Sequence, residues 1–234
     1  MITLVSWLWT QPEGRTTYKP EHVWLWADMI SRNLAMPHKL LCVTTETDLP
    51  PNVERIDPPG EFEDVQPKWG VRKPNCFRRL VMFKRDAAKT FGKRFVSMDL
   101  DVVIGGQLDP LFDRREDLVL YQGTAPSRPY NGSMMLIKAG CRTRVYDDFD
   151  QAGADASGEA FHGSDQAWLA HKLGPNEAVW TEADGVYHWG NYLSVCKRCK
   201  PRILFFPGKT KPWVMKPIFP FIRDNYCIKA KEAA

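Results

Sequence analysis

The chain has 234 residues, of which 44% are hydrophobic and 26% charged, and this composition suits one globular domain with a sizeable core. Its net charge of +4 is too small to favour a nucleic-acid partner, although it is compatible with an anionic ligand such as a nucleotide diphosphate. No apolar run approaches the length of a membrane span, and the short apolar N-terminus lacks the basic region and cleavage site of a signal peptide.

Strands and helices alternate in the first part of the sequence. Residues 2–7 form an apolar run that is typical of a buried strand, and Pro20 then begins a helix that extends to about Asn33. A second β-rich run covers residues 39–45. The proline-rich segment that follows, residues 46–73, is predicted to be loop with one short strand at most.

The middle of the sequence supplies a further helix and the remaining strands. Asn75 is predicted to cap a helix that ends at Gly92, because apolar residues between them mark one helical face. Strands are predicted at residues 94–98, 118–121 and 133–137, and Ser164 begins a helix that runs to about Leu173. This alternation predicts the α/β class, with a mixed, mostly parallel sheet flanked by helices.

Two aspartates, in Asp99-Leu100-Asp101, follow the predicted strand at 94–98. Ligands of open α/β sheets bind beyond the carboxyl ends of the strands, so both carboxylates could reach one cation there. A nucleotide-sugar has two phosphates whose negative charge grows as the sugar leaves, and hard cations prefer carboxylate oxygens. We therefore predict Asp99 and Asp101 as ligands of Mn²⁺ or Mg²⁺, the alternative being a strand-end turn with capping aspartates.

A second triplet with the same spacing, Asp148-Phe149-Asp150, shows that spacing alone is weak support. This copy lies in an acidic, helical stretch and is interpreted as a solvated helix surface. The first copy has apolar residues on both sides, and a carboxylate pair in such a setting is costly unless it is paired or binds a metal.

Five segments of the sequence, in the same order, resemble the retaining glycosyltransferases of family eight, the group of glycogenin and the bacterial lipooligosaccharide galactosyltransferases. The resemblance covers about residues 1–213 and implies a single Rossmann-like GT-A domain at 1–215, followed by a basic, Pro-containing tail at 216–234. The segments that carry it are Phe95–Ile104, Leu108–Phe112, Tyr130–Leu136, Asp165-Gln166 and Gly208-Lys209-Thr210-Lys211-Pro212-Trp213.

The resemblance implies a binding site for the donor sugar. Asn131 and Gln166 would hydrogen-bond to sugar hydroxyls, and Asp165 would hold the sugar or lie close to its anomeric carbon. Asp101 would ligate the metal directly, whereas Asp99 would face the metal or the ribose. Without the resemblance, Asn131 also reads as a turn residue and Asp165 as a carboxylate favoured at a helix start.

The same resemblance implies a diphosphate site. Lys211 would neutralise the leaving diphosphate and Trp213 would wall the pocket beside Gly208, although a basic aromatic loop is an equally good reading of these residues. Arg72 and Lys73 are further candidates for binding the diphosphate. The loop of residues 7–18 would bind the nucleotide base, with Tyr18 as a stacking residue.

The sequence departs from the family at one expected metal ligand. The family has a histidine three residues before the glycine of its Gly-x-x-Lys-Pro-Trp motif, and Phe205 stands at that position here. His162 and His188 are candidates to replace it from another loop. The family's Asn-Ser-Gly order is also changed, to Asn131-Gly132-Ser133.

These features predict a metal-dependent enzyme that moves a hexose, with retention, from a nucleoside diphosphate sugar to a hydroxyl acceptor. UDP-hexose is the expected donor, and the acceptor is expected to be a saccharide, a lipid-linked molecule or a protein. Six scattered cysteines form no disulfide framework, which favours a cytoplasmic protein, and the basic tail could contact an anionic membrane. The alternatives are a non-catalytic nucleotide-sugar-binding relative and a sugar-phosphate nucleotidyltransferase.

Overall fold

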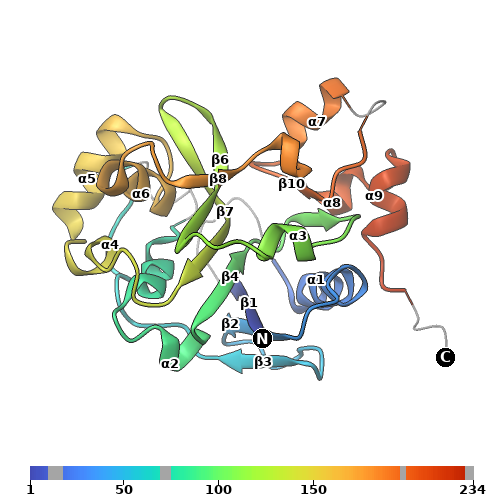
Figure 1. The fold of residues 1–234 in the computed structure, drawn as a ribbon, viewed down its shortest axis with the longest axis horizontal. Helices are drawn as coiled ribbons and strands as arrows, with labels where there is room; N and C mark the ends of the chain where they lie inside the picture. Colours follow the sequence, from blue (N-terminus) through green and yellow to red (C-terminus); the bar gives the residue numbers. More distant parts are fainter. Residues whose placement is uncertain (10–17, 69–74, 196–198, 230–234) are drawn as a thin grey trace.

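The computed structural model describes residues 1–9, 18–68, 75–195 and 199–229 (Figure 1). Within these ranges, seven strands form one sheet in the order β3-β2-β1-β4-β7-β6-β8, and three short strands form a second sheet in the order β5-β10-β9. The strands are β1 (Ile2–Leu8), β2 (His38–Thr44), β3 (Val53–Ile56), β4 (Arg94–Met98), β5 (Val102–Ile104), β6 (Leu118–Ala125), β7 (Arg128–Lys138), β8 (Ala178–Trp180), β9 (Val186–His188) and β10 (Ile203–Phe205).

The larger sheet is mixed and mostly parallel, as predicted. β1 lies parallel to β2 and to β4, β2 lies parallel to β3, and β6 lies parallel to β8. β7 runs antiparallel to both β4 and β6. The sheet therefore changes direction at β4 and β7, beside the end of the strand that carries the first aspartate triplet.

Helices and the smaller sheet cover the two faces of the larger sheet, because its central strands are apolar on both sides. In β1, Leu4 belongs to one core cluster and its neighbour Val5 to the other. The first cluster contains side chains of α1 (Pro20–Asn33) and of the second sheet. The second contains those of η1 (Phe77–Phe83), α4 (Arg144–Asp147), α5 (Gln151–Ala160) and α6 (Asp165–Leu173). Figure 1 shows these two groups on opposite sides of the strands.

The prediction of one continuous helix ending at Gly92 is wrong. The segment forms the 3₁₀ helix η1 and, after a break, the short helix α2 (Ala88–Phe91). Six of the seven η1 residues are buried, so the segment is enclosed rather than amphipathic. Lys84 then takes an extended backbone and donates from Nζ to Glu61 Oε1 at 3.0 Å, near the surface. Asn75 accepts from the Phe77 amide, in a turn that precedes the helix.

The C-terminal segment returns to the body of the domain. Its described part includes α8 (Pro212–Met215) and α9 (Pro220–Asn225), and Ile222 and Tyr226 belong to the first core cluster. Arg32 of α1 donates to the carbonyl oxygens of Asn225 and Cys227, each at 3.0 Å. The remaining helices are α3 (Asp109–Phe112), η2 (Glu182–Asp184) and α7 (Trp189–Val195). In the described part of the chain, no helix is both long and apolar enough to cross a membrane.

Candidate functional site

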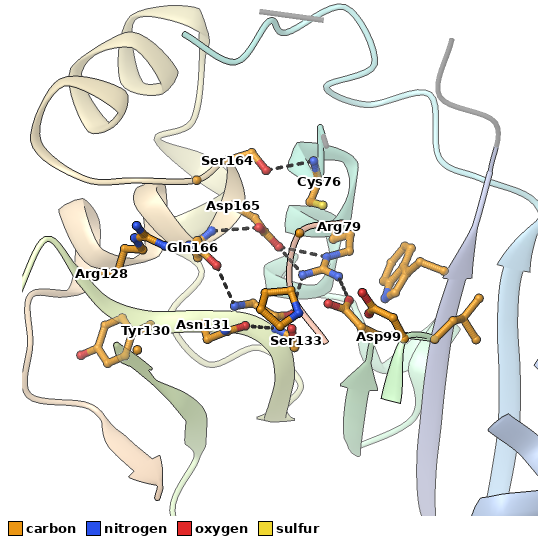
Figure 2. Close-up of a pocket in the computed structure, with 18 of the residues that line it drawn as sticks. Cys76, Arg79, Asp99, Arg128, Tyr130, Asn131, Ser133, Ser164, Asp165 and Gln166 are labelled. Atoms are coloured by element: carbon orange, nitrogen blue, oxygen red, sulfur yellow. Dashed lines mark hydrogen bonds and ion pairs between the residues drawn. The ribbon is translucent and has the colours of Figure 1, made fainter. Parts of the chain in front are cut away.

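A cavity of about 560 Å³ lies beyond the carboxyl ends of β1 and β4 (Figure 2). Its volume is in the range of small-molecule binding sites. The predicted site residues that line it are Asp99, Asp101, Asn131, Asp165, Gln166, Gly208 and Lys211.

One predicted residue with a described position, Trp213, does not line this cavity. Trp213 packs instead against His22, with ring centroids 4.3 Å apart, and against Tyr18 at 6.0 Å. It therefore supports the wall behind Lys211. Arg72 and Lys73 lie outside the described residues.

Strand pairing explains why distant segments meet here. The antiparallel register of β4 and β7 continues past Met98, so the Asp99 amide donates to the carbonyl oxygen of Ser133 at 2.9 Å. The Phe206 amide donates to the carbonyl oxygen of Asp101 at 3.1 Å, which holds the chain leading to Gly208 beside the aspartates. These two contacts thus bring the segments Tyr130–Leu136 and Gly208–Trp213 to the first aspartate triplet.

The Arg79 guanidinium connects three walls of the cavity, as Figure 2 shows. Nε donates to Asp165 Oδ2 at 2.9 Å, Nη1 to Asp99 Oδ1 at 2.6 Å and Nη2 to the Gly132 carbonyl oxygen at 2.6 Å. The Arg79 side chain is only 5% exposed, so these contacts supply the partners that a buried cation requires. Burial raises the pKa of Asp165, and the Arg79 charge opposes that rise.

A second buried ion pair joins Lys211 and Asp101. Lys211 Nζ contacts Asp101 Oδ2 and also donates to the Tyr18 hydroxyl at 3.0 Å. Burial raises the pKa of the Asp101 carboxyl, while the Lys211 charge opposes the rise. Burial and the nearby carboxylates raise the pKa of Tyr18, so its hydroxyl remains protonated. Trp7 and Trp9 also line the cavity and add flat apolar surface.

Asn131 and Gln166 each accept a hydrogen bond from a backbone amide of β7. Asn131 Oδ1 accepts from the Ser133 amide at 2.9 Å. Gln166 Oε1 accepts from the Gly132 amide at 3.2 Å, and its Nε2 donates to the His162 carbonyl oxygen at 2.8 Å. A Cβ on Gly132 would lie 2.8 Å from Arg79 Nη2, so a glycine in the middle of Asn131-Gly132-Ser133 permits the close approach of the guanidinium.

The expected metal ligands are reduced to two carboxylates. Among the described residues, no cluster of three or more His, Cys, Asp or Glu side chains could hold a metal ion. Phe205, at the position of the family's histidine, is buried and packs 5.3 Å from the Tyr121 ring. His162 and His188 line the cavity but do not complete such a cluster with the aspartates.

The two aspartates nevertheless fit a hard cation that arrives with a phosphate ligand. Within these ion pairs, Asp99, Asp101 and Asp165 carry three negative charges against the two positive charges of Arg79 and Lys211, which leaves one negative charge that favours a bound cation. Mg²⁺ is commonly held by one or two carboxylates together with substrate phosphates and water. The donor set therefore fits a divalent ion that binds jointly with a diphosphate.

Arg79 and Arg128 are cavity residues that the sequence did not identify as functional. Arg79 is one of several basic residues in the segment predicted as a helix ending at Gly92, and a solvated helix face is the ordinary interpretation of such a group. Its position inside the apolar run from Phe77 to Phe83 was the available signal, because an arginine enclosed by apolar residues needs a buried acidic partner.

Comparisons with known proteins identify the fold. No sequence model of a protein family matches the chain, and no curated protein sequence matches it. An active-site mutant of LgtC is similar over 90% of this chain and 89% of that chain, with a TM-score of 0.61 and 11% identity. The galactosyltransferase LgtC in complex with donor and acceptor sugar analogues matches over 91% of this chain and 89% of that chain, with a TM-score of 0.57 and 12% identity.

A third solved structure, the glycosyltransferase GlyE of Streptococcus pneumoniae TIGR4, matches over 91% of this chain and 56% of its own length. Its TM-score is 0.57 and its identity 13%. At such identities the similarity concerns the fold alone. The chain has the GT-A fold that LgtC also has, as the resemblance of its sequence motifs predicts.

Proposed function

We propose that this protein is a glycosyltransferase that moves a hexose from a nucleoside diphosphate sugar, with UDP as the expected nucleotide, to a hydroxyl acceptor. The observation that carries the proposal is the meeting of four separate segments at one cavity: Asp99 and Asp101, Asn131, Asp165 with Gln166, and Lys211. Together they supply carboxylates for a cation, amides for sugar hydroxyls and an ammonium group for the diphosphate.

In this proposal the nucleotide and the sugar occupy different parts of the cavity. The base lies against the aromatic surface of Trp7, Trp9 and Tyr18, and the diphosphate lies at Asp101 and Lys211. The sugar then lies beside Asn131, whose Nδ2 is turned to no described protein partner and can donate to a sugar hydroxyl. Asp165 and Gln166 act mainly as positioning residues, because their described hydrogen bonds hold Arg79, Gly132 and the His162 carbonyl.

Asp99 and Asp101 would hold Mn²⁺ or Mg²⁺ together with oxygens of the diphosphate. When bound, such an ion supplies positive charge opposite the negative charge that grows on the leaving group. When the donor is bound, the ion pair of Lys211 with Asp101 is broken, and the Lys211 ammonium group binds the diphosphate instead. The lysine therefore neutralises the aspartate before the donor binds and the leaving group afterwards.

The expected reaction retains the configuration at the anomeric carbon. The bond from that carbon to the diphosphate oxygen breaks, and the acceptor oxygen forms its bond on the same face. The departing phosphate takes the acceptor proton, so no protein base is required. The nucleoside diphosphate leaves with the electron pair of the broken bond.

The donor can be identified by thermal shift with a panel of nucleotide-sugars, each measured with and without Mn²⁺. We expect one UDP-hexose to raise the Tm only when the metal is present, and release of UDP on addition of an acceptor sugar. Binding without any release of UDP, by hydrolysis or by transfer, would instead identify a non-catalytic relative, which the absence of the histidine at Phe205 favours. Failure of every nucleotide-sugar to bind would contradict the proposal.

A further inference from the structure

Among the residues that the structure describes, one basic side chain of the cavity has no acidic partner. Three lysine and arginine side chains line the described part of the cavity, namely Arg79, Arg128 and Lys211. Arg79 and Lys211 are paired with aspartates. The Arg128 guanidinium makes no hydrogen bond or ion pair with any described residue, and Figure 2 shows no dashed line from it. A guanidinium has five N–H donors, so this group is available to a ligand.

The backbone that presents Arg128 is held on two sides. Arg128 is the first residue of β7, and at the irregular turn of the β6–β7 hairpin its carbonyl oxygen passes very close to Gly123, where an added Cβ would lie 1.6 Å from it. The amide of His162, in the segment between α5 and α6, donates to the Ser127 carbonyl oxygen at 3.1 Å. The hairpin tip is thus fixed to the segment that leads into Asp165, while the arginine side chain is exposed.

Arg128 lies on the far side of the sugar-binding residues from the aspartate triplet. In the view of Figure 2, Gln166 and Asp165 lie between Arg128 and Asp99. His188, which also lines the cavity, is close enough for the Arg128 charge to lower its pKa, in addition to the larger effect of burial. Its Nδ1 accepts from the Gly190 amide at 3.1 Å, so the neutral ring has its proton on Nε2 and is a donor.

We propose that Arg128 and His188 form an acceptor subsite that selects a sugar carrying an anionic group, either a carboxylate or a phosphate. The inference rests on the proposed function, since it assigns the diphosphate to the end of the cavity at Asp101 and Lys211. The anionic group receives hydrogen bonds from the Arg128 fork and from His188 Nε2, and it thereby places a hydroxyl of the same sugar beside the donor. Charge-assisted hydrogen bonds of this kind are about twice as strong as neutral ones.

Binding measured by NMR with saturating UDP and Mg²⁺ tests this subsite. The probes are methyl glucoside, methyl glucuronide and glucose 6-phosphate, which share a ring and differ in charge and in the kind of anion. We expect at least one acidic sugar to bind about tenfold or more tightly than methyl glucoside, and Arg128→Gln to remove that difference. The relative affinities of the two acids distinguish a carboxylate from a phosphate site.

Arg85→Gln is the matched control, because Arg85 is an exposed arginine outside the cavity, and it should leave the preference for acidic sugars intact. Equal binding of neutral and acidic sugars, no binding of any of them, or competition of the acidic sugars with UDP would overturn the proposal. UDP binding by the wild-type and Arg128→Gln proteins is measured first. Its absence from the wild-type protein contradicts the proposed function, whereas its presence with no acidic preference contradicts the acceptor subsite alone.

Discussion

The two aspartate triplets have the same spacing and very different surroundings. In Asp99-Leu100-Asp101, the Asp101 carboxylate is buried against Lys211. In Asp148-Phe149-Asp150, the Asp148 side chain is 37% exposed and pairs with surface cations, while Asp150 accepts from the Gly153 amide at 2.7 Å and caps α5.

The middle residue is buried in both triplets, Leu100 at 3% exposure and Phe149 at 6%. The spacing therefore indicates only that two aspartates flank a core residue and face away from it. The surroundings of each triplet decide what its aspartates face. At the sheet edge, the first triplet faces the buried side chains of Arg79 and Lys211, whereas at the start of α5 the second triplet faces solvent. Four pairs of substitutions test this difference.

The largest difference is expected in activity. Asp101→Asn should lower the rate of UDP release at least about 100-fold, because loss of a carboxylate ligand removes several kcal/mol of charge stabilisation from the reaction. Asp148→Asn makes the same chemical change in the second triplet and should leave the rate unchanged. Equal rates for Asp101→Asn and the wild-type protein would remove the first triplet from the site.

Arg79→Met is expected to have the largest effect on stability. It leaves Asp99 and the buried Asp165 without their shared cation, and breaking a buried ion pair in this way typically costs about 3–5 kcal/mol. The measurement is the free energy of unfolding from urea titration monitored by circular dichroism. Arg144→Met removes a partner of Asp148 whose side chain is 80% exposed, so its unfolding curve should overlie that of the wild-type protein.

Each triplet also has one lysine partner, Lys211 in the first and Lys172 in the second. Replacing each lysine in turn tests which triplet can bind a metal ion. Lys211→Met leaves Asp101 without its cation, so Mn²⁺ alone should raise the Tm of this variant by about 2–4 °C for each kcal/mol of binding free energy. The wild-type protein should need UDP as well as Mn²⁺ for a comparable rise. Lys172→Met, beside Asp148, should show no response to Mn²⁺. A response of the wild-type protein to Mn²⁺ alone, equal to that of Lys211→Met, would show that Lys211 does not compete with the metal.

The smallest effect is expected at the cap of α5. Asp150→Ala removes the acceptor for the Gly153 amide and should lower the free energy of unfolding by about 1 kcal/mol. The rate of UDP release should not change, because the residue lies outside the cavity. Asp150→Ser retains a capping oxygen and should recover most of the lost stability. A large fall in activity for Asp150→Ala would mean that the second triplet also contributes to the site.

The sequence predicts the long regular elements of this fold better than its short ones. The bounds of α1 are those expected from Pro20 and the spacing of its apolar residues, and the sheet class is also as predicted. Each strand of the second sheet has three residues, too few to show an alternating pattern, so this sheet was not predicted. The break after Phe83 was missed because burial on every side gives no amphipathic period.

For the candidate site, motif order pointed to the residues that lie around the cavity, but not to how they are joined. Asn131 and Gln166 were expected to face the sugar, yet the described bonds of Gln166 join β7 to the segment that precedes α6. The role of Arg79 was not predicted, because its partners are distant in sequence. Trp213 was predicted to wall the pocket, and its actual contacts with His22 and Tyr18 could not be foreseen because they too are distant in sequence. Local patterns carry no information on such contacts.

The Arg79 network also determines when the cavity can form during folding. One guanidinium joins residues that are 20, 53 and 86 positions away in the chain. Contacts of such separation require the closure of long loops, so they form late compared with the turns of α1. A nascent chain that has not yet reached Asp165 has the first aspartate triplet and the arginine but lacks the carboxylate that fixes the guanidinium. We therefore expect the cavity to be completed only after α6 has packed against β7.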